Sequence, residues 1–380
     1  NLTAAAALLL AVLILFQFLY QKDNKYTNGP PYGSQGIFAF SARDLTGSRP
    51  LFLIDGWEFY PDQLLTPDTI GSAPDQSMSF IFIRQYSKFS FLSSGHSPFG
   101  RATYRLLLQY DGEPRLLTLE VPELFTDYQL WINGQPVEQG SPFAAFYMDG
   151  TAEILLNTDN RSHYYSGLTY PPALGTPEAV HRMLFLRHMF YGILCIFPLA
   201  LCLYAAAAWR IRDRDRRLIH FGLLCLFFSI HCAYPFIHQL GLSGRLWYAV
   251  EDVSWMAMLY EVMVLSSVEA GFSGKLWYRR FLRPAAAAAC AVCGLSVLFP
   301  IPASPRLVNL YGAFLDGYKL LIWLYLLECA VYGLWMNRDS AGLVLAGCLT
   351  MGAAMVSNLL DNNQFEPVYT GWQTEYSGFI

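Results

Sequence analysis

Residues 102–140 read ATYRLLLQYDGEPRLLTLEVPELFTDYQLWINGQPVEQG, and this stretch decides the fold class of the region around it. Its apolar runs are short and alternate with polar residues, and the dipeptides Asp111-Gly112 and Asn133-Gly134 separate them. Asn, Asp and Gly favour the tight turns of β-hairpins because they accept positive φ angles. The stretch therefore predicts antiparallel strands joined by short turns.

The same alternation extends outward in both directions, through MSFIFIRQ (78–85) and AEILLN (152–157). We therefore predict an all-β antiparallel sandwich over residues 37–178. The polar residues 21–36, which are rich in Gly and Pro, predict a linker before it. The sandwich region contains no cysteine, so its core must hold it together without disulfides.

The chain as a whole is too apolar for a single water-soluble globule. Of its 380 residues, 54% are apolar and 14% are charged, against about 25% charged in soluble domains, and the mean hydropathy is +0.29. The formal net charge of −4 gives no basic excess, which argues against nucleic acid as a partner. The composition predicts a membrane protein that contacts lipid and has one soluble portion.

Apolar segments on both sides of the sandwich agree with this prediction. Residues 2–20 lack charges and a small-residue cleavage site, so we expect an uncleaved transmembrane anchor over residues 1–20. Residues 183–380 predict a seven-helix transmembrane domain whose seventh helix, starting near Trp372, is incomplete at Ile380. The complete spans are expected at 183–209, 218–237, 247–269, 281–299, 307–335 and 341–360.

The connecting loops predict how these spans are oriented. Alternate loops, at 210–217, 270–283 and 336–340, hold ten Lys and Arg residues, whereas the opposite loops hold two. Because basic loops stay in the cytoplasm, we expect a multi-pass protein of the bacterial cytoplasmic membrane with an extracellular sandwich. Residues 35–182 carry nine Lys or Arg and sixteen Asp or Glu, which disfavours polyanionic ligands.

Two motifs in the opening stretch carry a resemblance to a known family. A Gly-x-x-Thr-Tyr-Arg strand precedes a Pro-x5-Tyr-x-Leu-x-x-Asn-Gly hairpin, formed here by Gly100, Thr103, Tyr104, Arg105, Pro122, Tyr128, Leu130, Asn133 and Gly134. Together with NRSHYYSGLTYPPALG (160–175), these motifs resemble the bacterial seven-transmembrane receptors with diverse intracellular signalling modules. The family often has a Gly pair where this chain has Ser166-Gly167. The resemblance covers residues 50–380 and implies a jelly-roll or galactose-binding-like sandwich.

The resemblance also implies a function, that of a transmembrane signal receptor with a cytoplasmic output domain after its last helix. The segment DGWEFYPDQLL (55–65) is similar to receptors fused to histidine kinases, so the expected output is that of a two-component sensor histidine kinase, which would be a homodimer. No kinase His box, cyclase motif or nucleotide-binding glycine motif occurs in the sequence. We therefore expect no catalytic residue, metal site or cofactor here, and ATP and magnesium would belong to a kinase domain outside this chain.

Aromatic and polar residues of the predicted sandwich are the candidate ligand-binding residues. An aromatic ring can stack on a sugar, and the galactose-binding-like resemblance implies carbohydrate, but alternate aromatics on a strand also fill cores. Tyr104 and Arg105 are neighbours on a strand and must face opposite ways, so one belongs to the core and the other can reach a ligand. Residues 159–163 have juxtamembrane coupling as their alternative role. The candidate set is Tyr104, Arg105, Trp131, Asp159, Asn160, Arg161, His163 and Tyr165.

Charged residues within the predicted spans form a second candidate group. A charge in hydrocarbon is costly, so these residues should face a bundle interior and be paired. Asp316 and Lys319 are three positions apart and share a helix face. A structural ion pair and a polar switch that re-pairs on signalling both remain open. The expected network is Glu251, Asp252, Glu261, Asp316, Lys319 and Glu328.

Three functions remain open from the sequence. The favoured one is the sensing half of a signal receptor, whose sandwich binds a small molecule or a partner protein and whose residues 164–175 couple it to the first following helix. The alternative is a transporter or polysaccharide-modifying membrane protein with an external carbohydrate-binding module. The third is a scaffold whose sandwich binds only protein.

Overall fold

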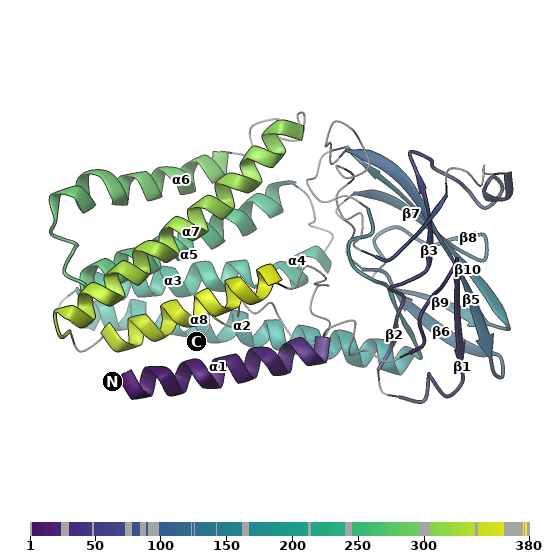
Figure 1. Ribbon diagram of the computed structural model, residues 1–380, viewed down its shortest axis with the longest axis horizontal. Helices are drawn as coiled ribbons and strands as arrows, with labels where there is room; N and C mark the ends of the chain where they lie inside the picture. Colours follow the sequence, from purple (N-terminus) through teal and green to yellow (C-terminus); the bar gives the residue numbers. More distant parts are fainter. Residues whose placement is uncertain are drawn as a thin grey trace. The chain divides into compact units, whose positions relative to one another are not determined.

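Strands occupy the middle of the chain, and α-helices precede and follow them (Figure 1). The computed structural model describes residues 2–23, 30–47, 49–72, 78–83, 89, 99–122, 124, 126–141, 143–161, 167–211, 214–239, 245–295, 305–338, 341–360, 375 and 377. The chain divides into two compact units. We call them the helical unit (Asn1–Lys22, His188–Ile301, Leu310–Ile380) and the β unit (Asp23–Arg187, Pro302–Asn309).

The β unit contains two sheets among its described residues. Sheet A has the order β4-β3-β5-β10-β7-β8, with β1 beside β5, and sheet B has the order β2-β11-β6-β9. The strands of sheet A are β1 (Ile37–Ser41), β3 (Trp57–Pro61), β4 (Ser79–Ile81), β5 (Gly100–Asp111), β7 (Asp127–Ile132), β8 (Gln135–Pro136) and β10 (Thr151–Asn160). Those of sheet B are β2 (Leu51–Phe52), β6 (Arg115–Glu120), β9 (Phe143–Met148) and β11 (Ala173–Gly175).

The turn between β7 and β8 follows directly from its sequence. Asn133 and Gly134 adopt φ angles of +51° and +75°, which confirms the tight turn predicted there. The antiparallel prediction fails for one pair, because β1 runs parallel to β5, with Ile37 opposite Leu107. A long excursion of the chain separates these two strands, so no hairpin fixes their relative direction.

One apolar core fills the space between the two sheets. Tyr104, Leu106 and Leu108 of β5 contribute to it from sheet A and are almost fully buried. Leu117 of β6 contributes to the same core from sheet B. Because neighbours on a strand face opposite sides, the burial of Tyr104 places Arg105 on the outer face of sheet A.

The helical unit is built from α-helices and one π-helical turn. Val12 and Phe16 of α1 pack with Ala354 of α8, and Figure 1 shows α1 beside α2 and α8. The elements are α1 (Leu2–Asp23), α2 (Pro177–Ile211), α3 (Arg216–His231), α4 (Tyr234–Gln239), α5 (Arg245–Glu269), the π-helix (Tyr278–Leu282), α6 (Arg283–Leu295), α7 (Pro305–Trp335) and α8 (Ala341–Leu360). The first turns of α2 belong to the β unit.

The prediction of an N-terminal anchor and a seven-helix transmembrane domain was wrong. Within the described ranges, one helix, α2, is long and apolar enough to cross a membrane, by length and composition. Helices form near the predicted spans, but most have too short an apolar stretch. With 13 residues, α6 is about 20 Å long at 1.5 Å per residue, against the roughly 30 Å of a bilayer core. Charged side chains interrupt α5 and α7.

The same finding corrects the predicted localisation. A multi-pass protein of the bacterial cytoplasmic membrane needs several spanning helices, and the described part of the chain provides one candidate. The apolar stretches of α1 and α8 are limited to Ala6–Phe18 and Ala341–Val356. Each is shorter than the roughly 20 residues that a spanning helix needs.

Candidate functional site

A charged cluster lies on the outer face of sheet A, where three neighbouring strands meet. In the ladder of β3 and β5, Glu58 is directly opposite Arg105. On the other side of β5, Arg105 is opposite Leu155, and Glu153 precedes Leu155 by two residues on β10 and shares its face. Pairing of these strands therefore brings together one cation and two carboxylates that are far apart in the sequence.

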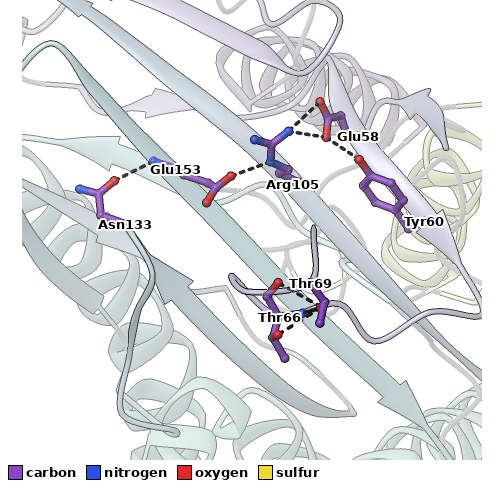
Figure 2. Close-up of polar contacts among 7 residues, drawn as sticks. All are labelled: Glu58, Tyr60, Thr66, Thr69, Arg105, Asn133 and Glu153. Atoms are coloured by element: carbon purple, nitrogen blue, oxygen red, sulfur yellow. Dashed lines mark hydrogen bonds and ion pairs between the residues drawn. The ribbon is translucent and has the colours of Figure 1, made fainter. Parts of the chain in front are cut away.

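Arg105 bridges the two carboxylates (Figure 2). Its Nε donates to Glu153 Oε1 at 2.6 Å, and its Nη1 donates to Glu58 Oε2 at 3.1 Å. The Tyr60 hydroxyl donates to the same Glu58 oxygen at 2.9 Å, and the Asn133 side-chain oxygen accepts the Glu153 backbone N–H at 2.8 Å. The cluster thus joins β3, β5, β10 and the turn between β7 and β8, and its hydrogen bonds orient the charged side chains.

The cluster is partly open to solvent. The side chains of Arg105, Glu58 and Glu153 are 31%, 14% and 24% exposed. Burial alone would lower the pKa of Arg105, but the hydrogen bonds and charges of Glu153 and Glu58 outweigh it and raise the pKa above its ordinary value. Arg105 therefore stays charged, and part of its side chain remains accessible to solvent.

Trp131 extends the cluster with an aromatic ring. It lies opposite Leu155 on β7, and Leu155 in turn lies opposite Arg105, so the three side chains form one row across the outer face. Trp131 is half-buried and Leu155 is buried. We call Glu58, Arg105, Glu153, Leu155 and Trp131 the Arg105 face.

The segment 62–72, between β3 and β4, is attached to the same face of sheet A. The Leu65 N–H donates to the Thr103 hydroxyl and the Leu65 carbonyl accepts from the Asn157 side chain, both at 2.9 Å. Thr103 and Asn157 are themselves buried and lie 2.6 Å apart, Oγ1 to Oδ1. A turn closed by Thr66 and Thr69 shapes the segment (Figure 2). The segment 62–72 therefore limits the area that a ligand could cover beside Arg105.

The structure separates the predicted ligand-binding residues. Arg105 and Trp131 share the Arg105 face, whereas Tyr104 and Asn160 are each 1% exposed and belong to the interior. Burial raises the pKa of Tyr104 well above its ordinary value, and its hydroxyl accepts the Leu168 N–H at 3.2 Å. Asp159 and the exposed Arg161 form an ion pair with each other. The predicted residues His163 and Tyr165 lie outside the described residues.

The two partners of Arg105 were not among the residues predicted from the sequence. Glu58 and Glu153 lie 47 and 48 residues from it along the chain, so only the strand register brings them together. A weak signal was present in WEFYP (57–61), where one charged residue stands among aromatics of an alternating strand. Such a residue must face away from the core, but its partner cannot be read from local sequence.

The predicted polar residues of the helical unit have different hydrogen-bond and ion-pair partners. Lys319 and Asp316 pair at 3.6 Å, and the Asp316 side chain is 81% exposed. Asp252 accepts the Tyr311 hydroxyl at 2.9 Å. Glu261 contacts His220 Nδ1 at 2.6 Å, and the backbone carbonyl of Glu251 accepts from the Ser254 hydroxyl. Glu328 is exposed. In the described part of the chain, no three His, Cys, Asp or Glu side chains are grouped as metal ligands.

A small cavity lies elsewhere on the β unit. It measures about 220 Å³ and is lined by Tyr32, Arg49, Phe52 and Asp55, among others. Small-molecule sites usually measure roughly 300–1,000 Å³. The cavity is therefore small for an organic ligand, and the Arg105 face is the better candidate.

Helix α2 is fastened to sheet B at its first turns. Thr176 follows β11 directly, and its hydroxyl accepts the Ala179 N–H at 3.3 Å. His181 packs its ring edge to face against Phe143 of β9, with ring centroids 5.2 Å apart. Arg187 pairs with Glu120 of β6 at 2.8 Å, and their side chains are only 16% and 6% exposed. These contacts attach the first turns of α2 to sheet B.

Comparison with known proteins gives no family for this chain. No protein-family model matches it, and no curated protein matches it at a significant level. The resemblance drawn from the motifs around Tyr104 and Asn133 therefore remains a prediction.

Proposed function

We propose that the chain is the sensing part of a signal receptor, in which the Arg105 face binds a neutral, hydroxyl-rich ligand of carbohydrate type. The observation that carries the proposal is the row of Arg105, Leu155 and Trp131, with a carboxylate on each side of the guanidinium. The kinase output expected from the resemblance lies outside these residues and stays a prediction.

The chemistry of the face suits a sugar better than an ion. Sugar hydroxyls can donate to the carboxylates of Glu58 and Glu153 and accept from the Arg105 guanidinium. The apolar face of the sugar ring can pack on Trp131, because aromatic rings offer large apolar contact area with little entropy to lose. One cation and two anions give the cluster a net negative charge, which disfavours acidic ligands.

A contiguous route leads from this face to α2. Tyr104, the residue next to Arg105, contacts the Leu168 backbone through its hydroxyl. Leu168 precedes β11, which pairs with β6 and leads within two residues into α2. A ligand that favours one position of β5 over another could therefore shift α2, provided that it binds the two arrangements with different affinity.

The test uses the full chain in a polyoxyethylene detergent, which carries no sugar. Its unfolding temperature is measured with galactose, glucose, mannose, N-acetylglucosamine and maltotriose. A sugar at about 100 times its dissociation constant should stabilise the β unit by roughly 2.7 kcal/mol. Trp131→Ala should abolish the shift, whereas the control Tyr147→Ala, which removes a 63% exposed aromatic of sheet B, should retain it.

Three results would contradict the proposal. If no sugar of this set changes the unfolding temperature, the carbohydrate assignment fails. If a sugar binds the unaltered chain but leaves amide hydrogen exchange in α2 unchanged, the β unit is a binding module and not a sensor. Trp131→Ala protein that still responds to the sugar would place the site elsewhere.

A further inference from the structure

A basic and aromatic segment of the helical unit takes no part in the proposed ligand site. Residues 275–283, between α5 and α6, read KLWYRRFLR and contain four basic and no acidic residues. The neighbouring acid Glu269 is 3.8 Å from Arg217. The segment therefore has an excess of positive charge along its own length, and the charge of Glu261 in α5 reaches its last residue, Arg283.

The π-helix (Tyr278–Leu282) gives this segment one buried side and one side that faces solvent. Tyr278 is 2% exposed and anchors the π-helix in the unit. Leu276 and Phe281 of the same segment are 70% and 69% exposed. Arg279 and Arg280 are exposed beside them. Cationic and apolar side chains therefore reach solvent from the same turn.

The end of α7 extends the same surface. Ring contacts run from Trp277 to Phe272 at 5.6 Å and from Phe272 to Tyr332 at 4.7 Å between centroids. Tyr332 in turn contacts Trp335 at 5.9 Å, and Trp335 is 77% exposed. Arg338 follows, and its guanidinium lies so near Gly271 that a Cβ there would be 3.1 Å from it. We call residues 275–283, Trp335 and Arg338 the basic rim.

We propose that the basic rim is a docking surface for the anionic headgroups of a phospholipid bilayer. Guanidinium groups pair with phosphate oxygens, whereas Trp, Phe and Leu side chains enter the boundary between headgroups and acyl chains. Charge alone would fit nucleic acid as well, but the exposed Leu276 and Phe281 need an apolar medium that a duplex does not offer. The proposal goes beyond the ligand-sensing function and uses no residue of the Arg105 face.

The test measures lipid preference at the rim in the full chain, reconstituted in phosphatidylcholine bilayers. Quenching of Trp277 fluorescence by dibrominated phosphatidylglycerol is compared with quenching by dibrominated phosphatidylcholine, and Trp277→Phe supplies the background. Because each basic residue near a surface adds binding to anionic lipid, phosphatidylglycerol should be preferred by roughly tenfold or more. Raising sodium chloride from 0.1 to 0.5 M should remove most of this preference, as screening requires.

A triple variant and a matched control locate the effect. Lys275→Gln, Arg279→Gln and Arg280→Gln together should bring the two lipids to nearly equal quenching. Three exposed arginines elsewhere, changed as Arg43→Gln, Arg182→Gln and Arg306→Gln, should leave the preference intact.

Three results would overturn the proposal. Equal quenching of the unaltered chain by both lipids, or a preference that persists in 0.5 M salt, excludes an electrostatic headgroup surface, and neither result depends on a variant folding. Full competition by 10 mM soluble glycerol phosphate would show a free-anion site instead of a membrane surface. Because sugar binding is read in the β unit, either proposal can fail while the other stands.

Discussion

Arg187→Met tests whether α2 is fastened to the sandwich by its ion pair with Glu120. The two side chains are 16% and 6% exposed and 2.8 Å apart, so they belong to the buried class of ion pairs. Removing one partner leaves a desolvated charge behind, which costs about 3–5 kcal/mol in such sites. Because the arginine keeps some contact with water, we expect a loss near 3 kcal/mol in the β unit.

The assay must report on the β unit alone, because a chain of two units does not unfold as one. Hydrogen exchange of β5 and β10 amides, measured by mass spectrometry in increasing urea, gives the free energy of opening of that unit. Arg161→Met is the matched control, since its side chain is 78% exposed in the ion pair with Asp159. It should leave the opening free energy unchanged within error.

A double variant separates the charge from the packing. Glu120→Leu combined with Arg187→Met replaces the pair by apolar side chains, and such replacements are often neutral or stabilising. The double variant should therefore recover most of the loss of Arg187→Met, and the cycle measures the coupling energy. The reasoning is refuted if Arg187→Met stays within 1 kcal/mol of the unaltered chain, or if the double variant is no more stable than the single one.

Three further changes test the interior of the β unit. Tyr104→Phe removes the acceptor of the Leu168 N–H and should cost roughly 1–3 kcal/mol in the β unit. Burial raises the pKa of Tyr104, so thermal stability should be level below about pH 10 and fall above it, and the Phe variant should show a weaker fall in a pH series of unfolding temperatures. Thr103→Val leaves the Leu65 N–H without its acceptor and should speed hydrogen exchange of that amide while costing about 1–3 kcal/mol. Gly167→Ala puts a Cβ against the Tyr104 hydroxyl at a φ of +76° and should lower the unfolding temperature more than Tyr104→Phe does; an equal or higher temperature would contradict the close approach.

Local sequence was sufficient for several of the strands and one turn, but not for the candidate site. The alternation around Tyr104 and Arg105 predicted opposite facings, and the Asn133-Gly134 turn formed as its chemistry requires. The site depends on which strand lies beside β5. Glu58 and Glu153 reach Arg105 through pairings that span nearly 50 residues, and period-2 patterns carry no information about such partners.

The helices illustrate a different limit of sequence reasoning. Apolar stretches predicted helices near their observed places, but hydropathy does not distinguish a bilayer from the interior of a helical unit. Glu261 is 4% exposed and is satisfied by His220, and Asp252 is satisfied by Tyr311. Polar groups paired in this way can be buried by protein alone. Counting apolar stretches therefore overestimated the number of spanning helices.

The energies along the route from Arg105 to α2 limit how it could signal. The hydrogen bond between Tyr104 and Leu168 is a neutral one, with a net contribution of roughly 1 kcal/mol, so losing it would change a two-state ratio by about fivefold. Moving the population ratio of two conformational states from 1:99 to 99:1 needs about 5.5 kcal/mol. One hydrogen bond cannot supply that difference. If α2 responds to a ligand, β11 must therefore move as a unit with its ladder to β6, and the buried pair of Glu120 and Arg187 must travel with the helix instead of breaking.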